Sequence, residues 1–271
     1  MKIVVDENMP HACELFAEFG EVVPLPGRQI GAADLQDADV LLVRSVTRVD
    51  AGLLASCPRL GFVGTATIGT DHIDTALLAE RGIPFFSAPG CNKYSVGDYV
   101  LSALLVLAER HELSLDQMSL AVIGAGNTGE CVAGKAEALG MRVLRCDPPR
   151  ARTEGGAGFV DYQTALGADI VSFHVPLTRE GAEATFPLLG EREIAALPGG
   201  QFLIHASRGE VWDNQALLAR QQSDQPLRLV MDVWEGEPEP LKALVPHTEL
   251  ATPHIAGYSL EGKARGTRML Y

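Results

Sequence analysis

Short apolar segments rich in β-branched residues alternate along the chain with longer segments of helical periodicity. In the first third, where polar or glycine-rich turns follow the apolar segments, the pattern predicts strands at 2–5, 39–43, 60–64 and 83–86. Further along it predicts strands at 119–124, 142–146, 169–174, 201–205 and 228–233. Strands that alternate with helices are typical of an α/β fold built on a parallel sheet.

One long, mostly apolar helix is predicted over residues 95–110, between the two series of strands. We place a domain boundary at its start, which gives domains at 1–94 and 95–257. A chain of 271 residues has room for two domains of roughly 150 residues each. The expected fold class is therefore α/β, with two doubly wound parallel-sheet domains. Such sheets bind ligands at the carboxyl ends of their strands.

Composition and charge exclude several classes of function. Hydrophobic residues make up 46% and charged residues 21%, which is ordinary for a globular protein. The net charge of −13 disfavours nucleic-acid binding, although a local arginine cluster can still bind a small anion. The longest apolar stretch, 99–108, is short of the roughly 20 residues that span a bilayer. Five scattered cysteines without a CxxC pair suggest neither disulfides nor a metal site. We expect a soluble, cytoplasmic protein without a membrane partner.

Residues 124–129 read Gly-Ala-Gly-Asn-Thr-Gly and fit the G-x-G-x-x-G pattern of dinucleotide-binding folds. The pattern follows a predicted strand and precedes a helix-like run at 130–139. We interpret Gly124 as the tight turn, Gly126 as the close approach to a pyrophosphate and Gly129 as the contact between helix and strand. Free N–H groups at the helix start would face the anion, so the candidate cofactor-binding residues also include Asn127 and Thr128.

The next predicted strand ends on Asp147, 18 residues after Gly129. An acid at about this spacing accepts hydrogen bonds from the ribose hydroxyls and repels a 2′-phosphate, which favours NAD over NADP. Arg145 and Arg150 nearby weaken this preference. Glu130 would place a negative charge beside the pyrophosphate, so we expect it to point to solvent. The alternative interpretation is a plain turn between strand and helix, followed by a surface acid.

Three later segments carry polar residues after an apolar strand, and they supply one arginine, one acid and one histidine. Arg208 keeps its charge at any working pH and suits a substrate carboxylate and a developing carbonyl. His254 titrates near neutrality and suits the removal of a hydroxyl proton. Glu237 would orient His254 and raise its pKa. This set predicts hydride transfer at a 2-hydroxy acid.

Other polar residues compete for roles in the same chemistry. Asp232 ends a predicted strand, and we interpret it as a neighbour of the nicotinamide amide. His72, His174 and His205 are alternatives for the base. His174 and His205 lie in or at the ends of predicted strands, which is also typical of packed residues.

The chain resembles the D-isomer-specific 2-hydroxyacid dehydrogenase family over essentially its whole length. The resemblance rests on residues 4–10, 42–47, 62–72, 87–92, 146–150, 232–238 and 252–263. It implies a flavodoxin-like substrate domain at 1–94, a Rossmann NAD-binding domain at 95–257 and, at 258–271, the start of a helix that returns to the substrate domain. Enzymes of this type form homodimers through a further C-terminal domain, which we expect this chain to lack, so its own dimerisation stays open.

The resemblance also implies roles for individual residues. Arg208, Glu237 and His254 match the family's catalytic positions. Contacts to the substrate are implied for Ser45, Thr67 and Tyr258, and contacts to NAD for Asp147, Asp232 and Gly257.

The implied reaction is the NAD-dependent oxidation of 4-phospho-D-erythronate to 2-oxo-3-hydroxy-4-phosphobutanoate, in the synthesis of pyridoxal 5′-phosphate. The alternatives are another family member, such as one acting on 3-phosphoglycerate, and an NAD-sensing binding protein. A phosphorylated acid needs more positive charge than Arg208 supplies. Arg44 is the favoured candidate for the phosphate, ahead of Arg48 and Lys93.

Overall fold

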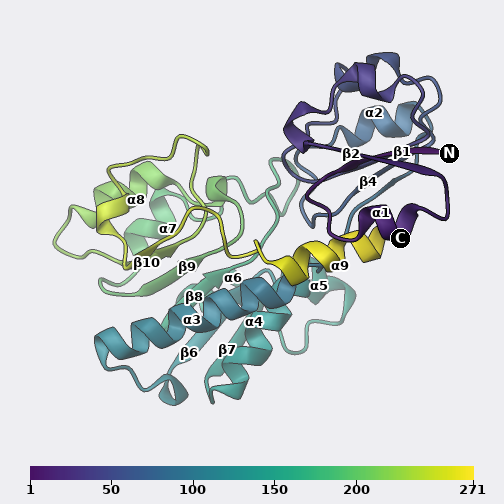
Figure 1. Cartoon of the computed structure of the whole chain (residues 1–271). Coiled ribbons are helices and arrows are strands. Elements are labelled where there is room, and N and C mark those ends of the chain that lie inside the picture. Colours follow the sequence, from purple (N-terminus) through teal and green to yellow (C-terminus); the bar gives the residue numbers. More distant parts are fainter. The chain divides into compact units, whose positions relative to one another are not determined.

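The computed structural model describes residues 1–271, which form two compact units (Figure 1). Unit 1 comprises residues 1–92 and 258–271, and unit 2 comprises residues 93–257. The boundary lies at Lys93, the first residue of the long helix α3 (Lys93–His111). No helix has both the length and the apolar character needed to cross a membrane.

Unit 1 is built on a five-stranded parallel sheet with the order β2-β1-β3-β4-β5, the flavodoxin-like order. Alternate strand residues face opposite sides: Ile3 and Val5 join one apolar cluster, and Val4 joins the other. Helices cover both faces, as predicted for a doubly wound sheet. The strands are β1 (Lys2–Asp6), β2 (Glu21–Leu25), β3 (Val40–Val43), β4 (Phe62–Thr65) and β5 (Phe85–Phe86), and the helices are α1 (Ala12–Phe16), α2 (Thr75–Glu80) and α9 (Leu260–Leu270).

Unit 2 contains a six-stranded parallel sheet with the order β11-β10-β9-β8-β6-β7. Helices α3 and α4 contact each other on one face of this sheet, and α6, α7 and α8 pack on the other (Figure 1). The strands are β6 (Ser119–Ile123), β7 (Arg142–Cys146), β8 (Ile170–Phe173), β9 (Phe202–His205), β10 (Arg228–Met231) and β11 (Leu250–Ala251), and the remaining helices are α4 (Asn127–Ala138), α5 (Pro148–Thr153), α6 (Tyr162–Leu166), α7 (Glu191–Ala196) and α8 (Asn214–Gln221).

A single parallel bridge between Phe159 and Arg145 continues the sheet of unit 2 beyond β7. With this bridge counted as a shortened third strand, the strands up to β10 follow the 3-2-1-4-5-6 order of dinucleotide-binding folds, and β11 adds a seventh strand beside β10. The predicted Rossmann fold is therefore confirmed. The strand order reverses between β6 and β8, where Gly124 follows one strand and His174 follows the other. This reversal marks the edge of the sheet at which such folds bind ligands.

Candidate active site

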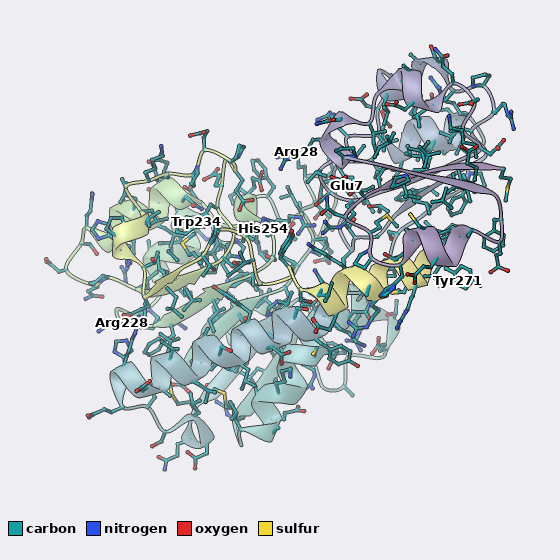
Figure 2. All side chains as sticks on the ribbon, in the orientation of Figure 1. Glu7, Arg28, Arg228, Trp234, His254 and Tyr271 are labelled. Atoms are coloured by element: carbon teal, nitrogen blue, oxygen red, sulfur yellow. The ribbon has the colours of Figure 1, made fainter.

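Arg208, Glu237 and His254 lie on loops that follow β9, β10 and β11 in unit 2. Nδ1 of His254 is 2.7 Å from Oε2 of Glu237, and the other carboxylate oxygen of Glu237 accepts the N–H of Trp234 at 2.8 Å. Figure 2 shows Trp234 and His254 on the same side of unit 2, away from Arg228 at the start of β10. The His254 and Glu237 side chains are 46% and 35% exposed, so a small molecule can reach them.

The charged groups around His254 shift its pKa in opposite directions. The hydrogen bond with Glu237 raises the pKa of His254, while burial and the positive charge of Arg208 act against this rise. Burial opposes the ionisation of Glu237, but the hydrogen bond with His254 outweighs it and lowers the pKa of that carboxyl. Because Glu237 engages Nδ1, the other ring nitrogen, Nε2, is available to accept a proton. Arg208 supplies a fixed positive charge close enough to influence both groups.

Asp232 holds the loop that carries His254. Its side chain is 1% exposed and accepts three hydrogen bonds, from Oγ1 of Thr252 at 2.7 Å and from the N–H groups of Ile255 and Ala256 at 2.8 Å each. Its carbonyl accepts the N–H of His254 at 2.7 Å. His254 has φ = 55°, a left-handed conformation that costs about 1–3 kcal/mol in a non-glycine residue. The Asp232 bonds offset this cost, a role that sequence reasoning missed.

The alternative histidines have different environments. Burial lowers the pKa of His174 to about 4 and that of His205 to about 3, so both are neutral at physiological pH. His205 is fully buried and stacks on Trp212 with ring centroids 4.2 Å apart. His205 is packed inside unit 2 and His174 is partly buried there, in keeping with their positions at strand ends. His72 belongs to unit 1, where its Nε2 lies 3.0 Å from Oγ1 of Thr65.

The glycine-rich loop has the geometry that a pyrophosphate needs. Gly124 has φ = 88°, and a Cβ at Gly129 would lie only 2.0 Å from the Gly124 carbonyl oxygen, so both positions require glycine. A Cβ at Gly126 would meet nothing within 4 Å, because this residue faces open space at the start of α4. Gly126 makes no side-chain cap, so the first N–H groups of the helix, at Asn127 and Thr128, lie at this open face. These features fit NAD.

Asp147 connects the end of β7 to this loop. One of its carboxylate oxygens accepts the N–H of Ala125 and the other accepts the N–H of Arg150, each at 3.0 Å. A carboxylate oxygen can accept a second hydrogen bond, so both remain available to ribose hydroxyls. The expectation that Glu130 points to solvent is wrong. Its carboxylate lies between two arginines, 3.0 Å from Nε of Arg145 and 2.7 Å from NH1 of Arg150, and the attraction of these charges holds it there.

Unit 1 contains the candidate substrate residues Arg44, Ser45, Thr67 and Tyr258. Arg44 follows β3, and its Nε is buried without a hydrogen-bond partner. Its guanidinium lies 5.8 Å from the centre of the Tyr258 ring. Ser45, the next residue, is exposed. Thr67 belongs to a hydroxyl network, in which its Oγ1 lies 2.7 Å from Oγ1 of Thr65 and donates to the carbonyl of Gly69.

Sequence reasoning missed Lys263, which α9 carries to the same group of side chains. Its Nζ lies 3.6 Å from the centre of the Tyr258 ring. A hydrogen bond from Lys263 and its positive charge lower the pKa of Tyr258. We call Arg44, Tyr258 and Lys263 the basic cluster. The sequence feature that could have indicated Lys263 is its position one helical turn after Ser259, the N-cap of α9. The weaker candidates differ, since Arg48 is 82% exposed and pairs with Asp50.

Gly257 is the last residue of unit 2 and directly follows the segment bonded to Asp232. Lys93 is the first residue of unit 2, and its Nζ lies 5.2 Å from the centre of the Tyr94 ring. Neither position belongs to the basic cluster.

Comparison with known proteins agrees with the geometry. The family described as "D-isomer specific 2-hydroxyacid dehydrogenase, NAD binding domain" matches residues 106–256. The chain is 85% identical to an erythronate-4-phosphate dehydrogenase of Aeromonas hydrophila, over 100% of this chain and 73% of that protein.

Two solved structures share the fold. The TT0316 protein of Thermus thermophilus has a TM-score of 0.83 at 27% identity, covering 98% of this chain and 93% of that one. An NAD-bound 3-phosphoglycerate dehydrogenase of Entamoeba histolytica has a TM-score of 0.83 at 23% identity, covering 99% and 92%. The family resemblance and the NAD cofactor predicted from the sequence are confirmed. The chain belongs to the D-isomer specific 2-hydroxyacid dehydrogenase family and is an NAD-dependent enzyme of that family.

Proposed function

We propose that this enzyme oxidises 4-phospho-D-erythronate to 2-oxo-3-hydroxy-4-phosphobutanoate, as a step in the synthesis of pyridoxal 5′-phosphate. The name of the Aeromonas hydrophila relative supports this substrate. The observation that carries the proposal is the basic cluster, because Arg44 and Lys263 add positive charge around Tyr258 in a chain whose net charge is −13.

The catalytic loops of unit 2 supply the groups that the reaction needs. Nε2 of His254 takes the proton of the C2 hydroxyl, and Glu237 stabilises the imidazolium that forms. Arg208 binds the substrate carboxylate and polarises the developing C2 carbonyl. NAD, when bound, accepts the hydride that leaves C2. The residues that we propose hold the cofactor are Gly124, Gly126, Gly129, Asn127, Thr128, Asp147, Asp232 and Gly257.

The basic cluster suits the phosphate of this substrate. Arg44 keeps an Nε–H without an internal partner, and a phosphate oxygen would satisfy it. Lys263 adds a second positive charge, and the hydroxyl of Tyr258 offers a further hydrogen bond. Ser45 and Thr67 provide hydroxyl groups in the same unit for the hydroxylated carbon chain.

The test compares NADH formation from 4-phospho-D-erythronate, D-erythronate and 3-phospho-D-glycerate. We expect 4-phospho-D-erythronate to have the highest kcat/KM, and Lys263→Ala to lower that value about 10- to 100-fold. The same variant should change kcat/KM for D-erythronate less than about twofold. Arg48→Ala, which removes an exposed arginine of the same unit, is the matched control and should leave both values unchanged.

Each part of the proposal has its own contrary result. Faster oxidation of 3-phospho-D-glycerate would contradict the substrate. Equal losses on the phosphorylated and unphosphorylated acids in Lys263→Ala would contradict the role of the basic cluster. Full activity in His254→Ala would contradict the assignment of the base. A dimer and a cytoplasmic location are further proposals, which sedimentation and cell fractionation would test.

A further inference from the structure

A group of charged side chains surrounds the outer side of the glycine-rich loop in unit 2. Glu130 bridges Arg145 and Arg150, Arg145 also pairs with Glu137 at 2.8 Å, and Arg150 pairs through two hydrogen bonds with Glu154 at 2.8 and 2.9 Å. Asp147 lies between the two arginines in sequence. Two guanidinium and four carboxylate groups therefore leave a net charge of −2 beside the cofactor loop.

Glu130 holds the two arginines in this arrangement. Burial opposes its ionisation, but the hydrogen bonds from Arg150 and Arg145 outweigh it and lower the pKa of the Glu130 carboxyl. Arg150 also donates to the carbonyl of Ala125, inside the glycine-rich loop, and its guanidinium lies 5.2 Å from the centre of the Phe159 ring. The Arg150 side chain is thus fixed on several sides, with its donors directed at groups of this chain.

Arginines after the second strand of a Rossmann fold are the groups that bind the 2′-phosphate of NADP. Here Arg145 lies near the end of β7 and Arg150 follows that strand, and the sequence alone therefore suggested a weakened preference for NAD. Their donors are instead engaged by Glu130, Glu137 and Glu154.

We propose that Glu130 is a specificity-determining residue, which excludes NADP by keeping Arg145 and Arg150 away from the 2′-phosphate. It acts together with Asp147, whose carboxylate repels the same group. The inference uses the NAD dependence of the family and does not depend on the proposed hydroxy-acid substrate.

The test measures dissociation constants of NAD⁺ and NADP⁺ by isothermal titration calorimetry without any hydroxy acid. Glu130→Gln keeps the shape of the side chain and removes its charge. We expect the affinity for NADP⁺ to rise about tenfold and that for NAD⁺ to change less than about twofold. The gain should shrink at high salt, because it rests on exposed charges. Glu130→Asp, which restores the charge, should return the ratio toward that of the parent protein.

Glu249→Gln is the matched control. Glu249 lies 2.9 Å from Arg228 and 3.7 Å from Arg110, so this variant also removes one negative charge between two arginines. It lies before β11, at the opposite edge of the sheet, and should leave both dissociation constants unchanged. Adding Arg150→Met to Glu130→Gln should abolish the gain in NADP⁺ affinity.

An unchanged ratio of the two dissociation constants in a folded Glu130→Gln would overturn the proposal, and so would an equal loss of affinity for both nucleotides. If that variant does not fold, Glu130→Ala carries the test, since it removes the same carboxylate from Arg145 and Arg150. A gain for NADP⁺ is again expected, and no gain refutes the inference. Because no hydroxy acid is present, failure of the proposed function would not affect either result.

Discussion

Replacing Asp232 by asparagine should reduce catalysis through the loop that carries His254. The substitution keeps the size of the side chain and changes one oxygen into an NH₂ group. The remaining oxygen can still accept hydrogen bonds from Thr252 and Ile255, while the NH₂ group would face the N–H of Ala256, which now bonds to the carboxylate at 2.8 Å. Two donors would then oppose each other at a site that is 1% exposed.

The size of the effect follows from these bonds. A hydrogen bond to a charged group contributes about 1.5–3 kcal/mol, and a buried unsatisfied donor adds a further cost. We expect Asp232→Asn to lower the free energy of unfolding by about 3 kcal/mol and the melting temperature by about 6–12 °C. Loss of the constraint that holds His254 at φ = 55° should displace its ring, and a displacement of about 1 Å lowers kcat about 100-fold.

The assay measures kcat at saturating NAD from the absorbance of the NADH formed, and it measures stability by thermal unfolding of the same variant. Gln221→Glu is the matched control, because Gln221 is 9% exposed and makes three hydrogen bonds, to the carbonyls of Leu227 and His247 and from the N–H of Leu227. It is also a swap between amide and acid of equal size, next to the amino end of β10, whereas Asp232 follows the carboxyl end. It should lose similar stability while keeping kcat within about threefold. Equal losses of kcat in the two variants would refute the reasoning.

Two further substitutions test the Glu237–His254 pair and the glycine-rich loop. As the proposed base, His254 must be neutral in the oxidation direction, so we expect kcat/KM to rise with pH through its pKa. Glu237 raises that pKa, so Glu237→Gln should move the rising limb to lower pH and lower the maximum about 10- to 100-fold. A limb that stays in place would contradict this. Gly129→Ala should abolish NAD binding in calorimetry, because its Cβ would lie 2.0 Å from the Gly124 carbonyl oxygen. Gly134→Ala, in the same helix but with nothing within 4 Å, should bind NAD normally and gain about 0.5–1 kcal/mol of stability.

The predictable parts of the fold are those with a clear local pattern, such as a short β-branched run between turn residues or a long apolar helical run. The strand at 142–146 was predicted with the bounds that the structure gives, and the long helix at 95–110 differs by two residues at its start and one at its end. The strand β2 was missed because Pro24 interrupts it and removes an N–H donor. The structure accommodates this proline because β2 is an edge strand, paired only with β1.

The residues of the candidate site also divide into those that could be predicted from the sequence and those that could not. Residues recognisable from local spacing, such as Gly124 and Asp147, could be found in the sequence. Lys263 was missed although it closely follows Tyr258, because spacing alone does not show that the two side chains meet. The bonds of Asp232 could not be predicted, because they join groups on separate segments of the chain. Glu130 was placed wrongly for the same reason: its partner Arg145 lies on a neighbouring strand, and local reasoning weighed only the expected anion.

The environments of Arg44 and Arg150 explain how an acidic chain can use some of its arginines for anions and withhold others. Both follow a strand of a parallel sheet, at the edge where such sheets bind ligands. Arg150 donates to Glu130, Glu154 and the Ala125 carbonyl, so a ligand phosphate would have to displace partners that are already charged or fixed. Arg44 has a buried Nε without a hydrogen-bond partner, and a second cation, Lys263, lies by the same tyrosine ring. A phosphate bound there would accept a hydrogen bond from that Nε–H and reduce the repulsion between Arg44 and Lys263. On the proposed roles of Arg44 and Arg150, the carboxylates around each guanidinium, rather than the net charge of the chain, would decide which arginine accepts an anion.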